Sequence, residues 1–445
     1  MTRTTRVMLL GCALACIGCA GYSDRTRDAR AALDQGRTHD AVVLFNERLG
    51  VASEKELPND IKGEKVLFVL ERSVALQALN QYELSSRDLE VADKQVEVLD
   101  FTRGTLDDIS KFMFSDDSGP YQAPAYEKLM INTLNMVNYL ARGDLNGARV
   151  EARRLAVMQQ FVTEHEAQGA AVGVPGSYLA GFTFEKSKEP GEALRFYDEA
   201  LTHGVFSSLT EPVARLSKLD AYRTQRITKL LESAPKSAAD AGDDAAELLV
   251  VVGYGRVPVK RAERIPIGLA LTLASSDLSP NSRAQANRLA AQGLVTWINF
   301  PTLPKPTRTY PLPTFNVDKR PTLIEPLATV DVEAVNAWRA TKGKMIASAI
   351  TRLITRVVAG EVARKATGGG TLGLLASLGT QVTMTATDTP DTRSWSTLPA
   401  RIAVGRVRLP PGQHVVDLSA NGQRVQKTVS LTKGGWAVLD LTVLR

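Results

Sequence analysis

Residues 139–148 read YLARGDLNGA, and this stretch decides the fold of the first half of the chain. It closes one helix-forming run, turns at Gly143 and begins a second run. Glycine tolerates the left-handed backbone conformation that ends a helix, and small residues at Gly143 and Ala148 let two antiparallel helices approach closely. The pattern predicts a helical hairpin centred on Gly143.

The same spacing occurs in two other places along the chain. Gly36 precedes Ala41 by the interval of this hairpin, and Lys188 stands in the same relation to Ala193. Each hairpin leaves an apolar face that only a neighbouring hairpin can cover, so such hairpins stack into an array. We therefore expect a helical repeat domain over residues 20–236.

The most complete copy of the pattern lies in the third hairpin. Its small and aromatic positions are Gly181, Phe184, Ala193, Tyr197 and Ala200. This arrangement resembles the tetratricopeptide repeat residue by residue. The resemblance implies a tetratricopeptide-like α-solenoid that binds other proteins, and it names no partner.

Beyond residues 237–244, which are rich in Ala, Asp and Gly, the pattern changes from helix to strand. Residues 247–254 form a short apolar, β-branched run that predicts a buried strand, with residues 257–267 as its candidate partner. Residues 297–317 are proline-rich and extended. Residues 332–365 predict one or two helices.

The carboxy-terminal residues carry the clearest β pattern of the chain. Asn421 and Gly422 lie between two apolar runs, and this dipeptide is the strongest short-range hairpin signal. We expect a small antiparallel sheet over about residues 400–445, packed on the preceding helices. Its predicted strands are residues 402–409, 414–419, 423–431 and 436–443.

Length and composition indicate an ordinary globular chain of more than one domain, with 445 residues, 44% hydrophobic and 23% charged. The formal net charge of +6 falls to +4 without the two arginines of the leader described below, which is too little to indicate nucleic-acid binding. The predicted fold class is α+β multidomain, in which a mixed α/β module at residues 245–445 follows the helical repeats.

Residues 1–19 have the features of a bacterial export signal. Two arginines precede an apolar run that is too short to span a bilayer as a mature helix. The segment ends in Gly18 and Cys19 and resembles the lipobox of bacterial lipoproteins, so Cys19 is the expected lipidation site. The sequence before Cys12 fits the lipobox better locally but leaves a shorter apolar core. An ordinary cleaved signal is the alternative.

The cysteines and the residue after Cys19 extend this interpretation. The three cysteines of the chain all lie in the leader, so the processed chain keeps one and has no disulfide pair. Ala20, and not Asp, follows Cys19. By resemblance to bacterial lipoproteins, this implies sorting to the outer membrane, with the protein lipid-anchored on the periplasmic face.

A candidate binding face lies on the hairpin around Gly143. Asparagines recur at intervals of three on its first helix, and Arg149 and Arg153 share a face of its second helix. A row of amides beside arginines could line a peptide-binding groove, and a solvated helix face is the alternative. The asparagines are Asn132, Asn135 and Asn138.

The whole chain resembles a family of uncharacterised proteobacterial periplasmic lipoproteins with tetratricopeptide-like helical repeats. The resemblance rests on the lipobox, on NYL at residues 138–140 leading to ARVEARR at 148–154, and on DTRSW at 391–395 before LP at 398–399. It implies a location and an architecture, and it carries over no catalytic residue.

The sequence contains no recognisable constellation for catalysis or for metal binding, so we expect no enzyme, no cofactor and no metal. None of the four histidines has a second histidine at metal-ligand spacing, and the acids at 116–117 lack the pattern of a calcium loop. The glycine-rich segment Gly368–Gly379 lacks the ending of a phosphate-binding loop. It predicts a turn into a packing helix or, alternatively, an apolar hairpin that meets a membrane or another subunit.

Three functions remain after these exclusions. The leading expectation is a scaffold or adaptor that binds another envelope protein through its helical repeats, in cell-envelope or peptidoglycan-related assembly. The alternatives are a subunit of a trans-envelope assembly or secretion complex and, third, a cell-wall hydrolase. The expected partners are an envelope protein and, through the lipid, the membrane.

Overall fold

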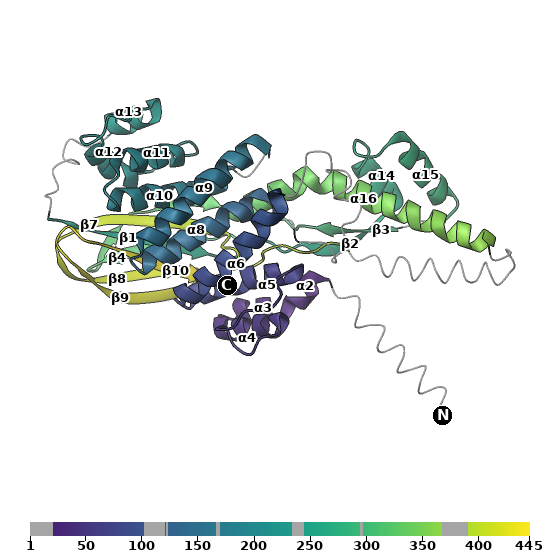
Figure 1. The fold of residues 1–445 in the computed structure, drawn as a ribbon, viewed down its shortest axis with the longest axis horizontal. Helices are drawn as coiled ribbons and strands as arrows, with labels where there is room; N and C mark the ends of the chain where they lie inside the picture. The colour runs from purple at the N-terminus through teal and green to yellow at the C-terminus, as the bar shows by residue number, and fades with distance from the viewer. Residues whose placement is uncertain are drawn as a thin grey trace.

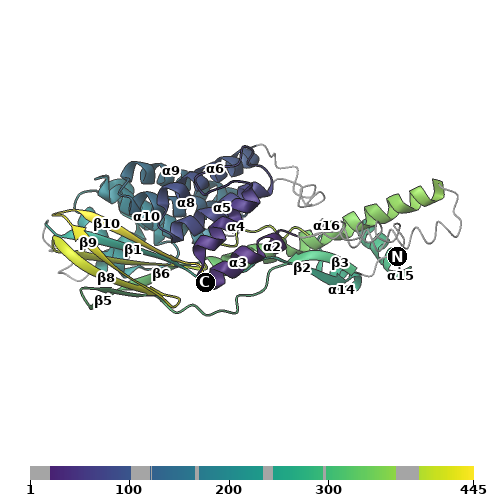
Figure 2. The ribbon, with the colours of Figure 1, turned by 90° about the horizontal axis from the view of Figure 1, so that it is seen from below.

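The computed structural model describes residues 21–101, 121, 123–165, 170–233, 244–293, 297–366 and 390–445. The described chain is a mixture of helix and small sheets, arranged as a layered body with a projecting arm (Figures 1 and 2). Cys19, the acids at 116–117 and the segment Gly368–Gly379 lie outside the described residues.

Within the described residues, eight helices pair into four antiparallel hairpins. The pairs are α3 (Arg27–Asp34) with α4 (Thr38–Leu49), α5 (Glu64–Ala78) with α6 (Tyr82–Phe101), α8 (Ala125–Ala141) with α9 (Leu145–His165), and α10 (Val174–Lys186) with α11 (Pro190–Ala200). Shorter helices complete this half: α2 (Tyr22–Arg25), η2 (Ala170–Gly173), η3 (Ser207–Leu209), α12 (Thr210–Leu216) and α13 (Gln225–Glu232).

The four hairpin turns share one backbone conformation. Each contains a residue with positive φ, and the amide of the next residue donates to the carbonyl five positions earlier, over 2.8–2.9 Å. This is the Schellman motif, which satisfies carbonyls left open at a helix end. The positive-φ residues are Gly36, Asn80, Gly143 and Lys188, and the fifth residues after them, all buried, are Ala41, Ser85, Ala148 and Ala193.

The hairpins predicted at Gly36, Gly143 and Lys188 are confirmed. The apolar spacing of residues 59–99 also predicts two helices, which are α5 and α6, but it does not predict their Schellman turn at Asn80. The packing role predicted for Gly143 is wrong, because a Cβ atom there would meet no other atom within 4 Å. Glycine serves only the backbone conformation at that turn. In this hairpin the helices approach closely at Gly147, where a Cβ would collide with the ring of Tyr139. In the third hairpin they do so at Gly181, against the ring of Tyr197.

Two sheets lie beneath the helices. The central sheet has the order β10-β1-β7-β6, and the second sheet has the order β5-β4-β8-β9. In the central sheet β1 is parallel to β10 and antiparallel to β7. The strands are β1 (Ala246–Tyr254), β4 (Thr314–Val317), β5 (Arg320–Thr322), β6 (Ile324–Thr329), β7 (Arg401–Leu409), β8 (Gly412–Ala420), β9 (Gln423–Leu431) and β10 (Trp436–Val443).

The four carboxy-terminal strands lie where the sequence predicts them, but the prediction of one small antiparallel sheet is wrong. Strands β8 and β9 stay together through the Asn421–Gly422 turn, in the second sheet. Strands β7 and β10 instead flank β1 in the central sheet. Every residue of β1 is buried, so this strand requires a neighbour on each side, and β7 and β10 supply them.

The arm is built from β2 (Arg261–Pro266), α14 (Ile267–Leu273), α15 (Pro280–Ala291), β3 (Trp297–Thr302) and the long helix α16 (Val330–Ala366), and it has its own apolar core (Figure 1). The predicted partner of β1 is therefore wrong, because β2 pairs with β3. The side chains of β2 are mostly exposed, which suits a two-stranded hairpin and not the middle of a buried sheet. The helix predicted over residues 332–365 is a single helix.

The helices cover one face of the central sheet and the second sheet covers the other (Figure 2). Leu249 and Val251 of β1 face the helices and join their core. Leu248 and Val250, which alternate with them, pack against the second sheet. We call the helices between Tyr22 and Glu232 the helical layer. The first strand begins only at Ala246, yet the helical layer and the central sheet share one core.

Candidate functional site

The asparagine row predicted to face solvent is buried, so that prediction is wrong. Asn132, Asn135 and Asn138 are each at most 1% exposed. Helix α8 packs against α6, α9, α10 and β10, so 15 of its 17 residues are buried. A helix enclosed on every side has no solvated face on which a groove could form.

Two of these asparagines connect helices inside the array. Asn138 accepts a hydrogen bond from Gln77 Nε2 and donates to Ser85 Oγ, both over 2.8 Å, and so joins α8 to α5 and α6. Asn132 donates to Glu151 Oε2 on α9 over 3.0 Å. Burial raises the pKa of Glu151, against the effect of this bond. Buried polar groups need such partners, so these contacts stabilise the stack.

The two predicted arginines differ in their surroundings. Arg149 is half-buried and pairs with Glu189 at 2.6 Å, which connects α9 to the start of α11. Arg153 lies on the surface, between Val150 and Val157, which are 48% and 67% exposed. Their spacing of three and four positions places the three on one stripe, which we call the outer face of α9. Of the five predicted binding residues, Arg153 alone lies on it.

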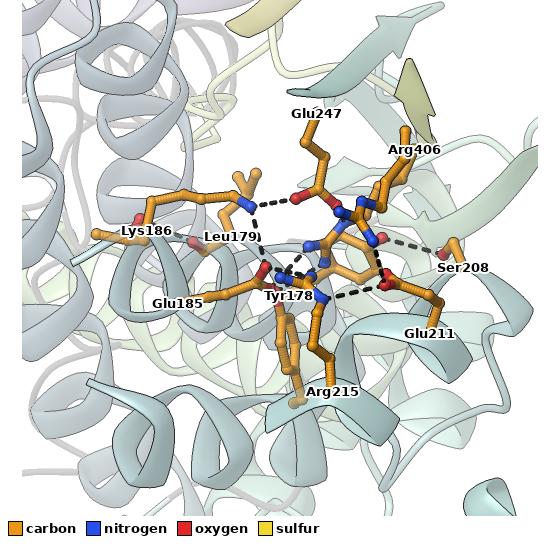
Figure 3. Close-up of polar contacts among 12 residues, drawn as sticks. Tyr178, Leu179, Glu185, Lys186, Ser208, Glu211, Arg215, Glu247 and Arg406 are labelled. Atoms are coloured by element: carbon orange, nitrogen blue, oxygen red, sulfur yellow. Dashed lines mark hydrogen bonds and ion pairs between the residues drawn. The ribbon is translucent and has the colours of Figure 1, made fainter. Parts of the chain in front are cut away.

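An ion cluster joins the helical layer to the central sheet, and the sequence did not reveal it (Figure 3). The side chain of Arg406 on β7 is 3% exposed, and it donates to Glu185 Oε2 at 2.7 Å and to Tyr197 Oη at 2.8 Å. It also pairs with Glu247 of β1. Lys186 pairs with both carboxylates. Charges from α10, β1 and β7 are thereby neutralised inside the protein.

The electrostatics of this cluster favour full ionisation. Burial opposes the charge on Glu185, but Arg406, Lys186 and Arg215 outweigh it and hold the pKa of Glu185 below its ordinary value. Arg406 acts in the same way on Glu247, whose pKa is also lowered against the effect of burial. Carboxylates held this firmly as anions are unsuited to donating protons, so the cluster has the character of a structural connection.

A second buried network holds the irregular segment before β7. Residues 392–400 are all buried without regular structure, and Trp395 is among the largest of the fully buried side chains. Glu71 of α5 accepts hydrogen bonds from the backbone amides of Ser396 and Thr397, over 2.9 and 2.7 Å. Glu127 of α8 accepts one from the amide of Trp395, over 3.1 Å. The landmark at 391–395 therefore has a packing role.

A buried carboxyl lies in a small cavity between the helices and the central sheet. Asp440 of β10 lines this cavity with Gln77 and Thr442, and its oxygens accept a hydrogen bond from Thr442 Oγ1 over 3.2 Å. Burial raises the pKa of Asp440 to about 7, while the bond from Thr442 and the charge of Lys427 act in the opposite direction.

Among the histidines in the described parts of the chain, His414 pairs with a carboxylate. Its Nδ1 lies 2.7 Å from Asp318 Oδ2, and its Nε2 lies 2.8 Å from the carbonyl oxygen of Pro410. The bond to Asp318 raises the pKa of His414. Both ring nitrogens are occupied by acceptors, so this imidazole connects β8 to the turn before β5.

Comparison with known proteins finds no match to any family model, curated protein or solved structure. Among the described residues, no group of three or more His, Cys, Asp and Glu side chains is placed to hold a metal ion. None of the helices in those same parts of the chain combines the length and hydrophobicity needed to cross a membrane. The site with the most exposed apolar surface on the predicted hairpin is the outer face of α9.

Proposed function

We propose that the protein is a lipid-anchored scaffold on the periplasmic face of the outer membrane. In this proposal, lipid on Cys19 holds the protein, and the helical layer binds another envelope protein. The observation that carries the binding proposal is the outer face of α9, where Val150 and Val157 flank Arg153 in solvent. Aliphatic side chains beside an arginine, on a rigid helix, form a surface suited to a protein partner.

The repeat character of the helical layer supports this function. Four hairpins have the same Schellman turn and the same buried small residue at a fixed distance after it. We therefore assign them to a tetratricopeptide-like α-solenoid whose inner surface is covered by the central sheet. The ion cluster and the contacts of Asn132 and Asn138 lie inside the protein, so we assign binding to the outer surface.

The beginning of the described chain supports the anchor. Tyr22 is fully buried, packs against Phe68 with ring centroids 5.1 Å apart, and donates to Glu71 over 3.2 Å. Tyr22 lies three positions after Cys19, and such a segment spans at most about 10 Å. A lipid on Cys19 would hold the body directly against the bilayer, without a long linker.

The binding proposal is tested by photocrosslinking in living cells. A photoreactive residue replaces Val157 or Val150 on the outer face of α9, and the matched control replaces Val415 on β8, which is 40% exposed. We expect an adduct with one envelope protein from the α9 positions and none from Val415. Adducts that are absent from both α9 positions, or identical at Val415, would contradict a binding site on α9.

A further inference from the structure

The positive charge of the protein is concentrated in the arm. Residues 260–302 and 330–366, which include its five elements, contain 12 Lys and Arg against five Asp and Glu, a net charge of +7. The whole chain has a net charge of +6, of which the leader supplies +2, so the rest of the chain is net −3. The exposed basic residues of the arm include Arg261, Arg264, Arg283, Arg288, Arg339 and Lys344.

The arm also exposes large apolar side chains next to these charges. Trp297 is 45% exposed and pairs with Pro266 across the two-stranded sheet of β2 and β3. Arg264 lies two residues from Pro266, so the alternation of side chains places Arg264 and Trp297 on the same outward face. Helix α14 follows Pro266 directly and exposes Leu269 and Leu273, by 48% and 38%.

The root of the arm lies beside the beginning of the described chain. Before the arm, Arg256 donates to Asp34 Oδ1 at 2.8 Å, and after it Thr392 Oγ1 accepts from the amide of Ser23 at 3.1 Å. Both views place α2 next to β2 (Figures 1 and 2). An open groove against α2 is lined by four basic and two acidic side chains, and one of the acids, Glu64, pairs with Arg25. The other lining charges are Arg48, Lys62, Lys65 and Glu47.

We propose that the arm docks on the anionic phospholipid surface beside the anchor. The inference rests on the proposed lipid anchor, which would bring α2 and the root of the arm to within roughly 10 Å of the bilayer. Basic side chains then meet lipid phosphates, and Trp297, Leu269 and Leu273 enter the boundary between headgroups and acyl chains. This combination of Lys and Arg with Trp and Leu is the chemistry of interfacial membrane binding. The anchor and the arm form two contacts that fix the orientation of the body.

The first test measures binding to vesicles by residues 20–445, which lack the lipidation site and are purified without lipid. Vesicles of phosphatidylcholine with phosphatidylglycerol are compared with vesicles of phosphatidylcholine alone. We expect binding only to the anionic vesicles, and weaker binding as salt is raised. Reversing two charges, Arg264→Glu with Arg288→Glu, is expected to weaken it at least ten-fold, because each basic residue at such a surface is worth roughly five-fold.

The matched control reverses two exposed charges at the other end of the long axis, Lys319→Glu with Arg320→Glu in the turn between β4 and β5 (Figure 2). We expect this variant to bind as the parent does. Equal binding to both kinds of vesicle, no binding to either, or equal losses in the arm and control variants would overturn the proposal.

A second measurement uses the full anchored protein in vesicles that contain brominated phospholipids. We expect these lipids to quench a component of the tryptophan fluorescence that disappears in Trp297→Phe. No difference between the parent and Trp297→Phe would count against the docked arm. If the protein is not lipidated in cells but residues 20–445 bind anionic vesicles, the proposed anchor fails and the proposed role of the arm stands. If the protein is lipidated but residues 20–445 do not bind, the anchor stands and the role of the arm fails.

Discussion

Replacing Arg406 with methionine is expected to lower the free energy of unfolding by about 3–5 kcal/mol at pH 7, measured by chemical denaturation. The change removes one of the two cations that contact both Glu185 and Glu247, and these neighbouring buried carboxylates keep Lys186 as the other. Removing one member of a buried ion pair costs far more than the pair contributes, because the remaining charge has lost its hydration and its partner. Methionine fills a similar volume, so lost packing is a minor part of the effect.

The control for Arg406→Met is Arg424→Met on the second sheet. Arg424 pairs with Asp417, but its side chain is 74% exposed, so we expect little change in the free energy of unfolding. Adding Glu247→Gln to Arg406→Met should recover part of the loss, because it removes one of the two buried carboxylates that would then share Lys186. Equal losses for Arg406→Met and Arg424→Met, or no recovery in the double variant, would show that the cluster does not connect the two layers.

Asp440→Asn is expected to stabilise the protein at pH 8 by on the order of 4 kcal/mol and to change little at pH 4. The folded-state pKa of Asp440 is about 7, whereas an unfolded aspartate titrates near 3.9. Between these values the folded chain holds a proton that the unfolded chain has released. The contribution of this group to stability is therefore complete below about pH 4 and is lost as pH rises through about 7.

Asparagine can still accept the hydrogen bond from Thr442 Oγ1 and carries no charge at any of these pH values. The measurement is the free energy of unfolding of parent and variant across pH 4 to 8. Asp417→Asn is the control, because Arg424 lowers the pKa of Asp417 and removing that carboxylate gives no gain at pH 8. A difference between Asp440→Asn and the parent that stays constant with pH would contradict a neutral buried carboxyl.

Local features of the fold could be predicted from the sequence because neighbouring residues determine them. The turns at Gly36 and Gly143 follow from glycine before a small residue at a fixed interval. The turn at Asn80 uses the same geometry with Asn and Ser in place of Gly and Ala. Asparagine also accepts positive φ, so a pattern that allowed Asn80 and Ser85 would have located the turn between α5 and α6.

Arrangements that depend on residues far apart in the chain could not be predicted from the sequence. The positions of the last strands follow from alternation, but which sheet each strand joins depends on β1 and β4, far earlier in the chain. Asn132 and Asn138 were predicted to be exposed because they are polar. They are buried because their hydrogen-bond partners lie on other helices. One signal was present, since the apolar residues of α8 surround the whole helix, as expected for an enclosed one.

The ion cluster could not be predicted from the sequence for the same reason. Glu185 and Arg406 lie 221 residues apart, so no local pattern could pair them. The available signal was the presence of Glu247 and Arg406 inside apolar strand runs, because charges at such positions are seldom buried without a partner. The cluster holds the helical layer on the sheet, and the asparagine contacts hold its helices together. The outer face of α9 and the arm are the surfaces to which we assign binding.

We propose that lipid on Cys19 holds the body against the membrane. Mass spectrometry of the amino-terminal peptide from the membrane fraction is the direct test of this anchor. We predict that the mature chain begins at an acylated Cys19, and that Cys19→Ser abolishes lipid labelling and releases the exported protein from membranes. An unmodified amino-terminal peptide, or acylation that depends on Cys12 or Cys16, would contradict the account.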